Sequence, residues 1–173
     1  KLAAHIDPGT KAIGSTIYVF PSGDPTLQSR YYQSQPSSIE RIKKMLSNFS
    51  EFDGTLSIDA SLYNQFNTPR GWIWEDMGNY FGTTPTPLMW RDNSLHVYFN
   101  SAQPGAAALL SNKTQGLNEF DFVNQLDAAE GNRDDAWFFS APNTSLIYAK
   151  GSIPAHRKDF LVKAAHPKPM EPF

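Results

Sequence analysis

The sequence of 173 residues contains no cysteine. This absence excludes disulfide bonds, thiol nucleophiles and every metal or cluster site that needs thiolate ligands. A chain of this length can bury a hydrophobic core without disulfides. We therefore predict a single globular domain over residues 1–165, followed by a proline-rich tail, residues 166–173, that is expected to be disordered.

Charge is also scarce. Charged residues make up 18% of the chain, and 15 basic against 17 acidic side chains give a formal net charge of −2. An average domain carries about 25% charged residues. The near balance argues against a dedicated nucleic-acid-binding protein, which would carry a strongly basic face. We expect no nucleic-acid partner.

Long apolar runs are absent as well. A membrane-spanning helix needs about 18 or more consecutive apolar residues, and no such run occurs, so no membrane span is expected within this chain. Aromatic residues reach 13%, and three Asn-X-Ser/Thr sequons begin at Asn48, Asn112 and Asn143. Together with the low charge, these features favour an extracytoplasmic location, whether secreted, periplasmic or on the cell surface.

Two segments carry helical signals. Ser37 and Glu40 form a capping box, and apolar residues at helical spacing follow on one face: Ile39, Ile42, Met45, Leu46 and Phe49. This pattern predicts a helix whose apolar face lies in the core. A second helix is predicted over residues 119–130, capped by Asn118 and stopped by a left-handed Gly131.

The other regular segments favour strands, predicted at residues 16–20, 55–59, 71–75, 88–91, 94–100, 136–140, 145–149 and 159–163. The clearest is 94–100, where Leu95, Val97 and Phe99 alternate with polar positions. Asp92-Asn93 and Pro142-Asn143 are predicted hairpin turns. Because the connections are too short for regular βαβ crossovers, the sequence predicts an α+β fold. It would be mainly an antiparallel sheet with one or two helices packed on one face.

The densest group of candidate ligand-binding residues combines aromatic rings with carboxylates. Rings can stack on the C–H face of a sugar, and neighbouring carboxylates can bond its hydroxyl groups. The predicted binding residues are Trp72, Trp74, Glu75, Asp76, Tyr80 and Trp90. The alternative is that Trp72 and Trp74, which would share one face of a strand, pack in the core.

No motif assigns a catalytic or metal-binding residue, and no cofactor is expected. None of the four histidines stands in an H-x-x-x-H or H-E-x-x-H pattern, and no G-x-S-x-G elbow occurs. Asp134 and Asp135, with acidic residues upstream, could bind calcium or perform glycosidic acid–base chemistry. Adjacent aspartates on a strand point to opposite faces, however, which weakens that interpretation.

The sequence therefore predicts a non-enzymatic extracytoplasmic recognition or surface-assembly domain that serves in adhesion, as a structural subunit or in glycan binding. Its expected partner is a protein or carbohydrate ligand on a surface. Self-association is a further expectation, because residues 119–135 are acidic and the C-terminal region is basic. The alternative is a small carboxylate-based hydrolase that acts on glycan. A concave site with converging carboxylates would distinguish the hydrolase.

Overall fold

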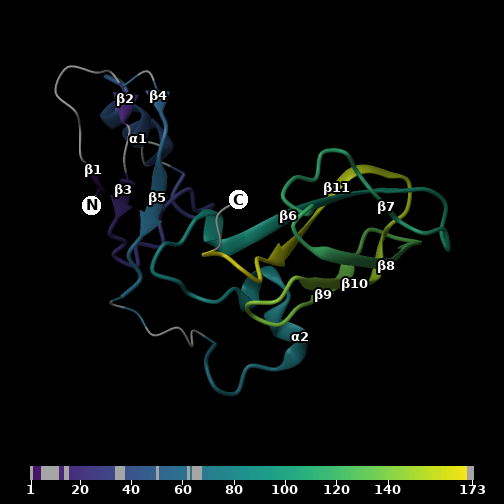
Figure 1. Cartoon of the computed structure of the whole chain (residues 1–173). Helices are drawn as coiled ribbons and strands as arrows, with labels where there is room; N and C mark the ends of the chain where they lie inside the picture. The colour runs from purple at the N-terminus through teal and green to yellow at the C-terminus, as the bar shows by residue number, and fades with distance from the viewer. Residues whose placement is uncertain are drawn as a thin grey trace. The chain divides into compact units, whose positions relative to one another are not determined.

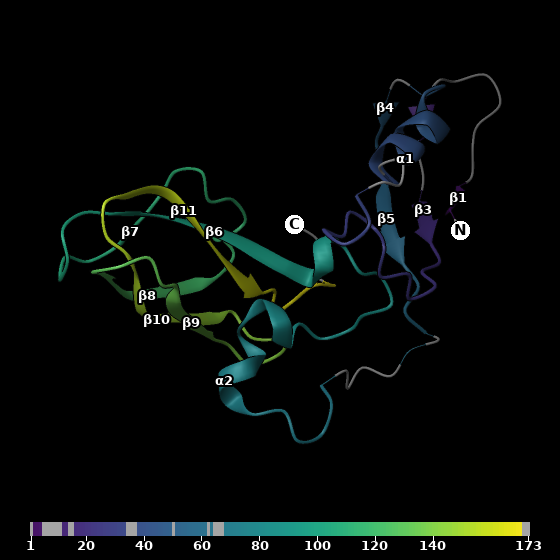
Figure 2. The ribbon, with the colours of Figure 1, turned by 180° about the vertical axis from the view of Figure 1, so that it is seen from behind.

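The computed structural model describes residues 2–4, 12–13, 16–33, 38–49, 51–61, 63 and 68–170. The chain divides into two compact units, which Figures 1 and 2 show from opposite sides. Unit 1 comprises Lys1–Phe66 and Thr86–Asp92, and unit 2 comprises Asn67–Pro85 and Asn93–Phe173. The number of independently folding domains stays a prediction.

Unit 1 contains a small mixed sheet. Its strands are β1 (Leu2–Ala4), β3 (Thr16–Val19) and β5 (Thr55–Ile58), in the order β1-β3-β5. The β1–β3 pair is antiparallel and the β3–β5 pair is parallel. A separate parallel pair joins β2 (Ala12–Ile13) to β4 (Glu51–Phe52). The strands predicted at 16–20 and 55–59 are confirmed.

Helix α1 (Ser38–Leu46) confirms the predicted first helix but not the burial of its apolar face. Ile42 is 39% exposed and Met45 is 59% exposed. The prediction that this face lies in the core is wrong for these two residues. Helical periodicity defines an apolar side of a helix, but it does not say what covers that side.

Unit 2 is built from two three-stranded sheets. In one sheet, β6 (Ser94–Ser101) lies between β11 (Arg157–Ala165) and β7 (Leu109–Leu110). In the other, β10 (Leu146–Pro154) lies between β8 (Asp121–Ala129) and β9 (Asp135–Phe139). The core of the unit joins residues of both sheets, among them Leu95, Val97, Phe99, Leu126, Phe138, Ile147 and Ile153.

Two short segments outside the named strands connect the two sheets through main-chain hydrogen bonds and close main-chain contacts. Ala108 N donates to Leu126 O and Ala128 N donates to Ala106 O, each at 2.8 Å, so the segment before β7 pairs with β8. On the other side Ala165 N donates to Gly78 O at 2.9 Å. A Cβ on Gly78 would stand 2.1 Å from Phe138 O, so only glycine allows this approach to β9. These contacts cover part of the outer strand edges.

The helix predicted over 119–130 is wrong, because these residues form β8. Their burial alternates with a period of two: Leu126 and Ala128 are buried, whereas Gln125 and Asp127 are exposed. Pairing with β10 along the whole length of β8 fixes the extended backbone. Gly131 does take the predicted left-handed conformation, with φ +90°, but it follows a strand.

Two predicted strands are also wrong. The segment 71–75 leads into the short helix α2 (Trp74–Met77), and 88–91 is irregular up to the 3-10 turn η2 (Arg91–Asn93). Asp92 and Asn93 have positive φ values of 58° and 50°, as predicted for a turn, yet no hairpin forms because no strand precedes them. The predicted strands at 94–100, 136–140, 145–149 and 159–163 are confirmed as β6, β9, β10 and β11.

The predicted α+β class is confirmed, and the sheets are antiparallel or mixed. The sheet β11-β6-β7 is wholly antiparallel, whereas the sheets centred on β3 and β10 each combine one antiparallel pair with one parallel pair. Parallel pairs join β2 to β4, β3 to β5 and β8 to β10. Whether helices pack on one face of a sheet stays a prediction. His166 and Pro167, where the predicted tail begins, are buried, and residues 171–173 lie outside the described residues. In the described part of the chain, no helix has the length and apolar character that a membrane crossing requires.

Candidate binding surface and family membership

The structure gathers most of the predicted ligand-binding residues in one segment of unit 2. Trp74, Glu75 and Asp76 lie on α2, and Tyr80 opens the 3-10 turn η1 (Tyr80–Gly82). Trp72 lies just before α2 and is half-buried. We call Trp72–Gly82 the α2–η1 segment.

Close backbone contacts hold the α2–η1 segment in its compact shape. Asn79 N donates to Asp76 O at 3.0 Å, and Gly82 N donates to Asn79 O at 2.8 Å. A Cβ on Gly82 would stand 1.9 Å from Asp76 O. Because that neighbour is backbone, a side chain at position 82 would force the two turns apart.

Asn79 fastens this segment to the edge of β9. Its side chain is buried, and its Nδ2 donates to Glu75 O at 2.5 Å and to Phe138 O at 3.3 Å. Phe138 N donates to Asn79 Oδ1 at 3.0 Å. The amide therefore completes the hydrogen bonding of an edge-strand residue and fixes where the rings and carboxylates of α2 stand.

Aromatic contacts extend from the α2–η1 segment onto β9. Trp74 stacks on Phe139 with centroids 6.3 Å apart, and Phe81 meets Trp137 edge-on at 6.4 Å. Trp74, Phe81 and Trp137 are 47%, 54% and 43% exposed. The alternative that places Trp74 in the core is therefore wrong. The sequence prediction did not include Phe81, Trp137 or Phe139 among the binding residues. For Trp137, the local signal in the sequence is that it alternates with the buried Phe138.

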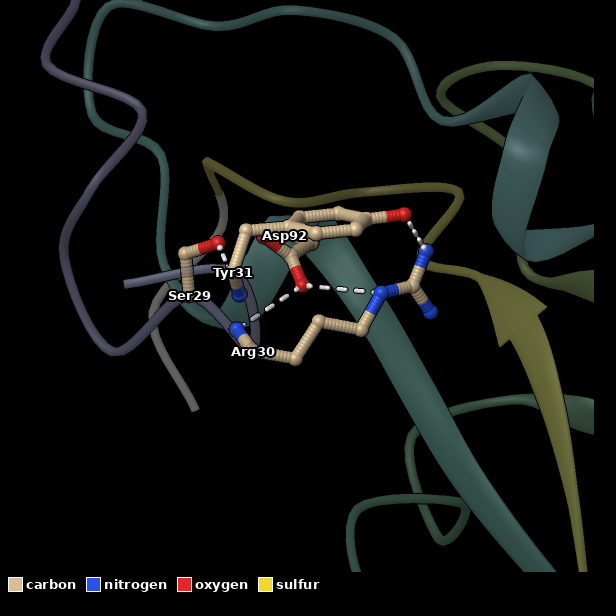
Figure 3. A network of polar contacts seen from close by, with 4 residues as sticks. All are labelled: Ser29, Arg30, Tyr31 and Asp92. Atoms are coloured by element: carbon tan, nitrogen blue, oxygen red, sulfur yellow. Dashed lines mark hydrogen bonds and ion pairs between the residues drawn. The ribbon is translucent and has the colours of Figure 1, made fainter. Parts of the chain in front are cut away.

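Trp90 belongs to unit 1 and lies in a different setting. It is half-buried, with the Arg91 guanidinium 6.0 Å from its ring centroid. The neighbouring Asp92 accepts from Arg30 N at 3.3 Å and forms an ion pair with Arg30 Nε at 3.7 Å (Figure 3). Arg30 also donates to the Tyr31 hydroxyl at 2.7 Å. These bonds anchor the segment around Trp90 to residues 29–31.

The acidic pair Asp134 and Asp135 does not resemble a metal site. Asp135 forms an ion pair with Arg133 at 2.7 Å, and Asp134 accepts from Ala136 N at 3.1 Å. Partial desolvation raises the pKa of the Asp134 carboxyl, opposed by the Ala136 hydrogen bond, and the charge of Asp135 adds to the rise. Among the described residues, no group of three or more His, Asp or Glu could hold a metal ion.

Comparison with known proteins identifies the family. The family model described as the D-Ala-D-Ala carboxypeptidase 3 (S13) family matches residues 2–171. This chain belongs to that family. Penicillin-sensitive carboxypeptidase A of Dictyostelium discoideum is 26% identical over 83 residues, which cover 44% of this chain and 15% of that protein.

The fold is similar to that of a solved member of the penicillin-binding proteins. Penicillin binding protein 4 (dacB) from Haemophilus influenzae matches with a TM-score of 0.64 and 19% identity, over 95% of this chain and 35% of that chain. A structure of the same protein complexed with a novel β-lactam matches with a TM-score of 0.50 and 17% identity, over 95% of this chain and 33% of that chain. This chain thus spans only part of the length of these relatives.

Family membership corrects the functional interpretation of the sequence. The prediction of a non-enzymatic recognition domain, with its adhesion, structural-subunit and binding-module interpretations, is wrong because the family is one of carboxypeptidases. The alternative, a carboxylate-based hydrolase acting on glycan, is a different class of hydrolase from the one that the family description names. The family description specifies a peptide bond between two D-alanine residues.

The sequence did not indicate an enzyme because the catalytic motifs known from penicillin-binding proteins are missing from these residues. Penicillin-binding proteins use a serine nucleophile in an S-x-x-K motif, together with S-D-N and K-T-G motifs. None of the three occurs in these 173 residues. The nearest approach is Lys113-Thr114-Gln115, which has glutamine in place of the glycine, and Lys113 Nζ lies over the Tyr98 ring at 4.4 Å.

Proposed function

We propose that this chain is part of a penicillin-sensitive D-Ala-D-Ala carboxypeptidase and that it contributes substrate-binding surface, while the nucleophilic serine belongs to another part of the protein. The family match over residues 2–171 carries the proposal. Two further observations support it. The catalytic motifs S-x-x-K, S-D-N and K-T-G do not occur in these residues. In addition, the α2–η1 segment of unit 2 carries exposed aromatic rings and carboxylates close together in the chain.

The proposed binding residues are those of the α2–η1 segment: Trp72, Trp74, Glu75, Asp76 and Tyr80. Carboxylates accept hydrogen bonds from peptide amides and form ion pairs with amino groups, and exposed rings cover aliphatic stems. This chemistry suits the peptide that carries the terminal D-Ala-D-Ala. Trp90, in unit 1, is a separate candidate.

The substrate proposed here is peptidoglycan, a polymer of carbohydrate and peptide. Peptidoglycan lies outside the cytoplasmic membrane, so the proposal carries an extracytoplasmic location with it. The predicted carbohydrate partner then becomes part of the substrate. Self-association stays a prediction, based on the acidic segment 119–135 and the basic C-terminal region of the sequence.

The test uses the whole protein that contains this chain. Release of D-alanine from a soluble peptide ending in D-Ala-D-Ala should be measurable, and penicillin should abolish it. Glu75→Gln should raise KM more than it lowers kcat, because Glu75 would bind substrate without taking part in bond cleavage. Glu119→Gln, a matched change at another exposed acid, should alter neither constant. If the whole protein releases no D-alanine, the proposed function is wrong.

A further inference from the structure

The outer face of the β8-β10-β9 sheet carries two rows of side chains that cross its strands. In one row Tyr148 of β10 lies opposite Val123 of β8 and Phe139 of β9. In the next row Lys150 lies opposite Gln125 and Trp137. The alternating residues Phe138, Ile147 and Ala149 are buried in the core. Since successive side chains point to opposite faces of a sheet, both rows face outward.

The α2–η1 segment lengthens both rows. Trp74 stacks on Phe139 with an interplanar angle of 27°, so it continues the first row. Phe81 continues the second row through its edge contact with Trp137, and Tyr80 meets Phe81 edge-on at 5.4 Å. The result is a strip of rings that runs from β10 across β9 to α2. We call this strip the ring platform.

Polar groups border the ring platform. Gln125 and Lys150 stand within the second row, and the following row places Ser152 opposite Asp127 and Asp135. The Asp135 carboxylate is paired with Arg133, so the border is close to neutral. Amide, ammonium and hydroxyl groups beside ring faces match the hydroxyl, N-acetyl and C–H groups of an amino-sugar polymer. A contiguous exposed aromatic patch normally marks a binding surface.

The two rows also match an extended ligand. Equivalent positions two residues apart along a strand are about 6.6–6.8 Å apart, so the rows form a broad strip instead of a single stacking position. A single small ligand would leave most of these rings in water. A polymer would cover rings on β10, β9 and α2 together.

We propose that the β9 and β10 part of the ring platform, with Trp137, Phe139, Tyr148 and Lys150, binds the glycan strand of peptidoglycan and so holds the polymer while its peptide is cleaved at the catalytic serine. The inference rests on the proposed function for the choice of polymer, and it leaves Trp74 and Tyr80, at the α2 end of the platform, in contact with the peptide. This is a substrate-holding surface of an enzyme.

The probe for the test is a preparation of glycan strands from which the peptides have been removed enzymatically. The whole protein should bind these strands, with a Kd measured by titration calorimetry. Tyr148→Ala and Trp137→Ala should each weaken binding about tenfold, the loss expected for one ring contact. Both side chains are exposed, so the variants should fold, and circular dichroism checks this. Leu56→Ala, an exposed apolar residue of unit 1, is the matched control and should bind as the wild type does.

Kinetics separate this inference from the proposed function. For the ring-platform variants, kcat/KM on polymeric peptidoglycan should fall about tenfold further than kcat/KM on a soluble D-Ala-D-Ala peptide. If the wild type cleaves the soluble peptide but does not bind the glycan strands, the ring platform is not a glycan site. Equal losses on both substrates, which a face covered by the rest of the protein would give, would also overturn it. If the wild type cleaves neither substrate, the proposed function itself fails.

Discussion

Asn79→Ala should destabilise unit 2 through a single side chain that lies at the junction of the α2–η1 segment and β9. The Asn79 side chain is 4% exposed and bonds both the N–H and the C=O of Phe138. Alanine cannot replace either bond. Phe138 is fully buried, so water has little access to the two groups that would be left unsatisfied.

The expected loss follows from these two groups. Each buried polar group left without a partner costs about 1–3 kcal/mol, so the two groups of Phe138 together predict a loss of roughly 2–6 kcal/mol in the free energy of unfolding. The third bond, to Glu75 O, belongs to an exposed residue, where water can take its place. Urea denaturation followed by circular dichroism measures the loss, and an unchanged m-value would show that the compactness of the unfolded state is the same.

Asn124→Ala is the matched control. Asn124 also bonds two backbone groups through its side chain, Ala108 O and Leu126 N, but Asn124 itself is exposed and these two bonds are only part-buried, whereas the bonds between Asn79 and Phe138 are buried. Because these two bonds are only part-buried, water can replace them in part, and the loss should be smaller than for Asn79→Ala. If Asn79→Ala costs no more than Asn124→Ala, then Asn79 does not hold the α2–η1 segment to β9 in the way described.

Three further changes test other parts of the structure. Gly82→Ala should cost more than about 1 kcal/mol in a denaturant melt, because its Cβ would stand 1.9 Å from the backbone oxygen of Asp76; a neutral result would mean that η1 sits further from α2. Ile42→Asp should cost less than about 1 kcal/mol, since this α1 residue is 39% exposed; a loss of several kcal/mol would show that its face is covered. The pKa of Asp134 is raised, so the folded state holds the proton more tightly than the unfolded state, and its contribution to stability falls as pH rises from about 3.8 through the raised pKa. Asp134→Asn should remove that slope, measured as the difference between wild-type and variant melts across pH; equal slopes would refute the assignment.

The sequence predicted correctly those strands whose apolar spacing fits a strand but does not fit a helix. In 94–100 the apolar residues Leu95, Val97 and Phe99 occupy alternate positions, and a helix would scatter them around its axis. In 119–130 the spacing of four between Phe122 and Leu126 fits a helix face and a strand face equally well. Pairing with β10, which places Asp121 beside Leu146, decided between them. Such a parallel partner leaves no local signal.

The α2–η1 segment was singled out correctly for its rings and carboxylates, but its backbone was predicted as a strand. Trp72 and Trp74 favour extended structure, whereas the close approaches at Gly78 and Gly82 require a turn that only the folded unit reveals. Trp137 comes from β9, far along the chain, and joins the surface only through folding. The enzymatic nature of the family could not be read from the sequence, because its catalytic motifs do not occur in these residues.

The central claim is that this chain is a substrate-binding part of a penicillin-sensitive carboxypeptidase whose nucleophile is elsewhere. Peptide mapping by mass spectrometry after treatment of the whole protein with penicillin tests it most directly. We predict one covalent adduct, on a serine of an S-x-x-K motif outside these 173 residues. The absence of any adduct, or an adduct on a serine within these residues, would contradict it.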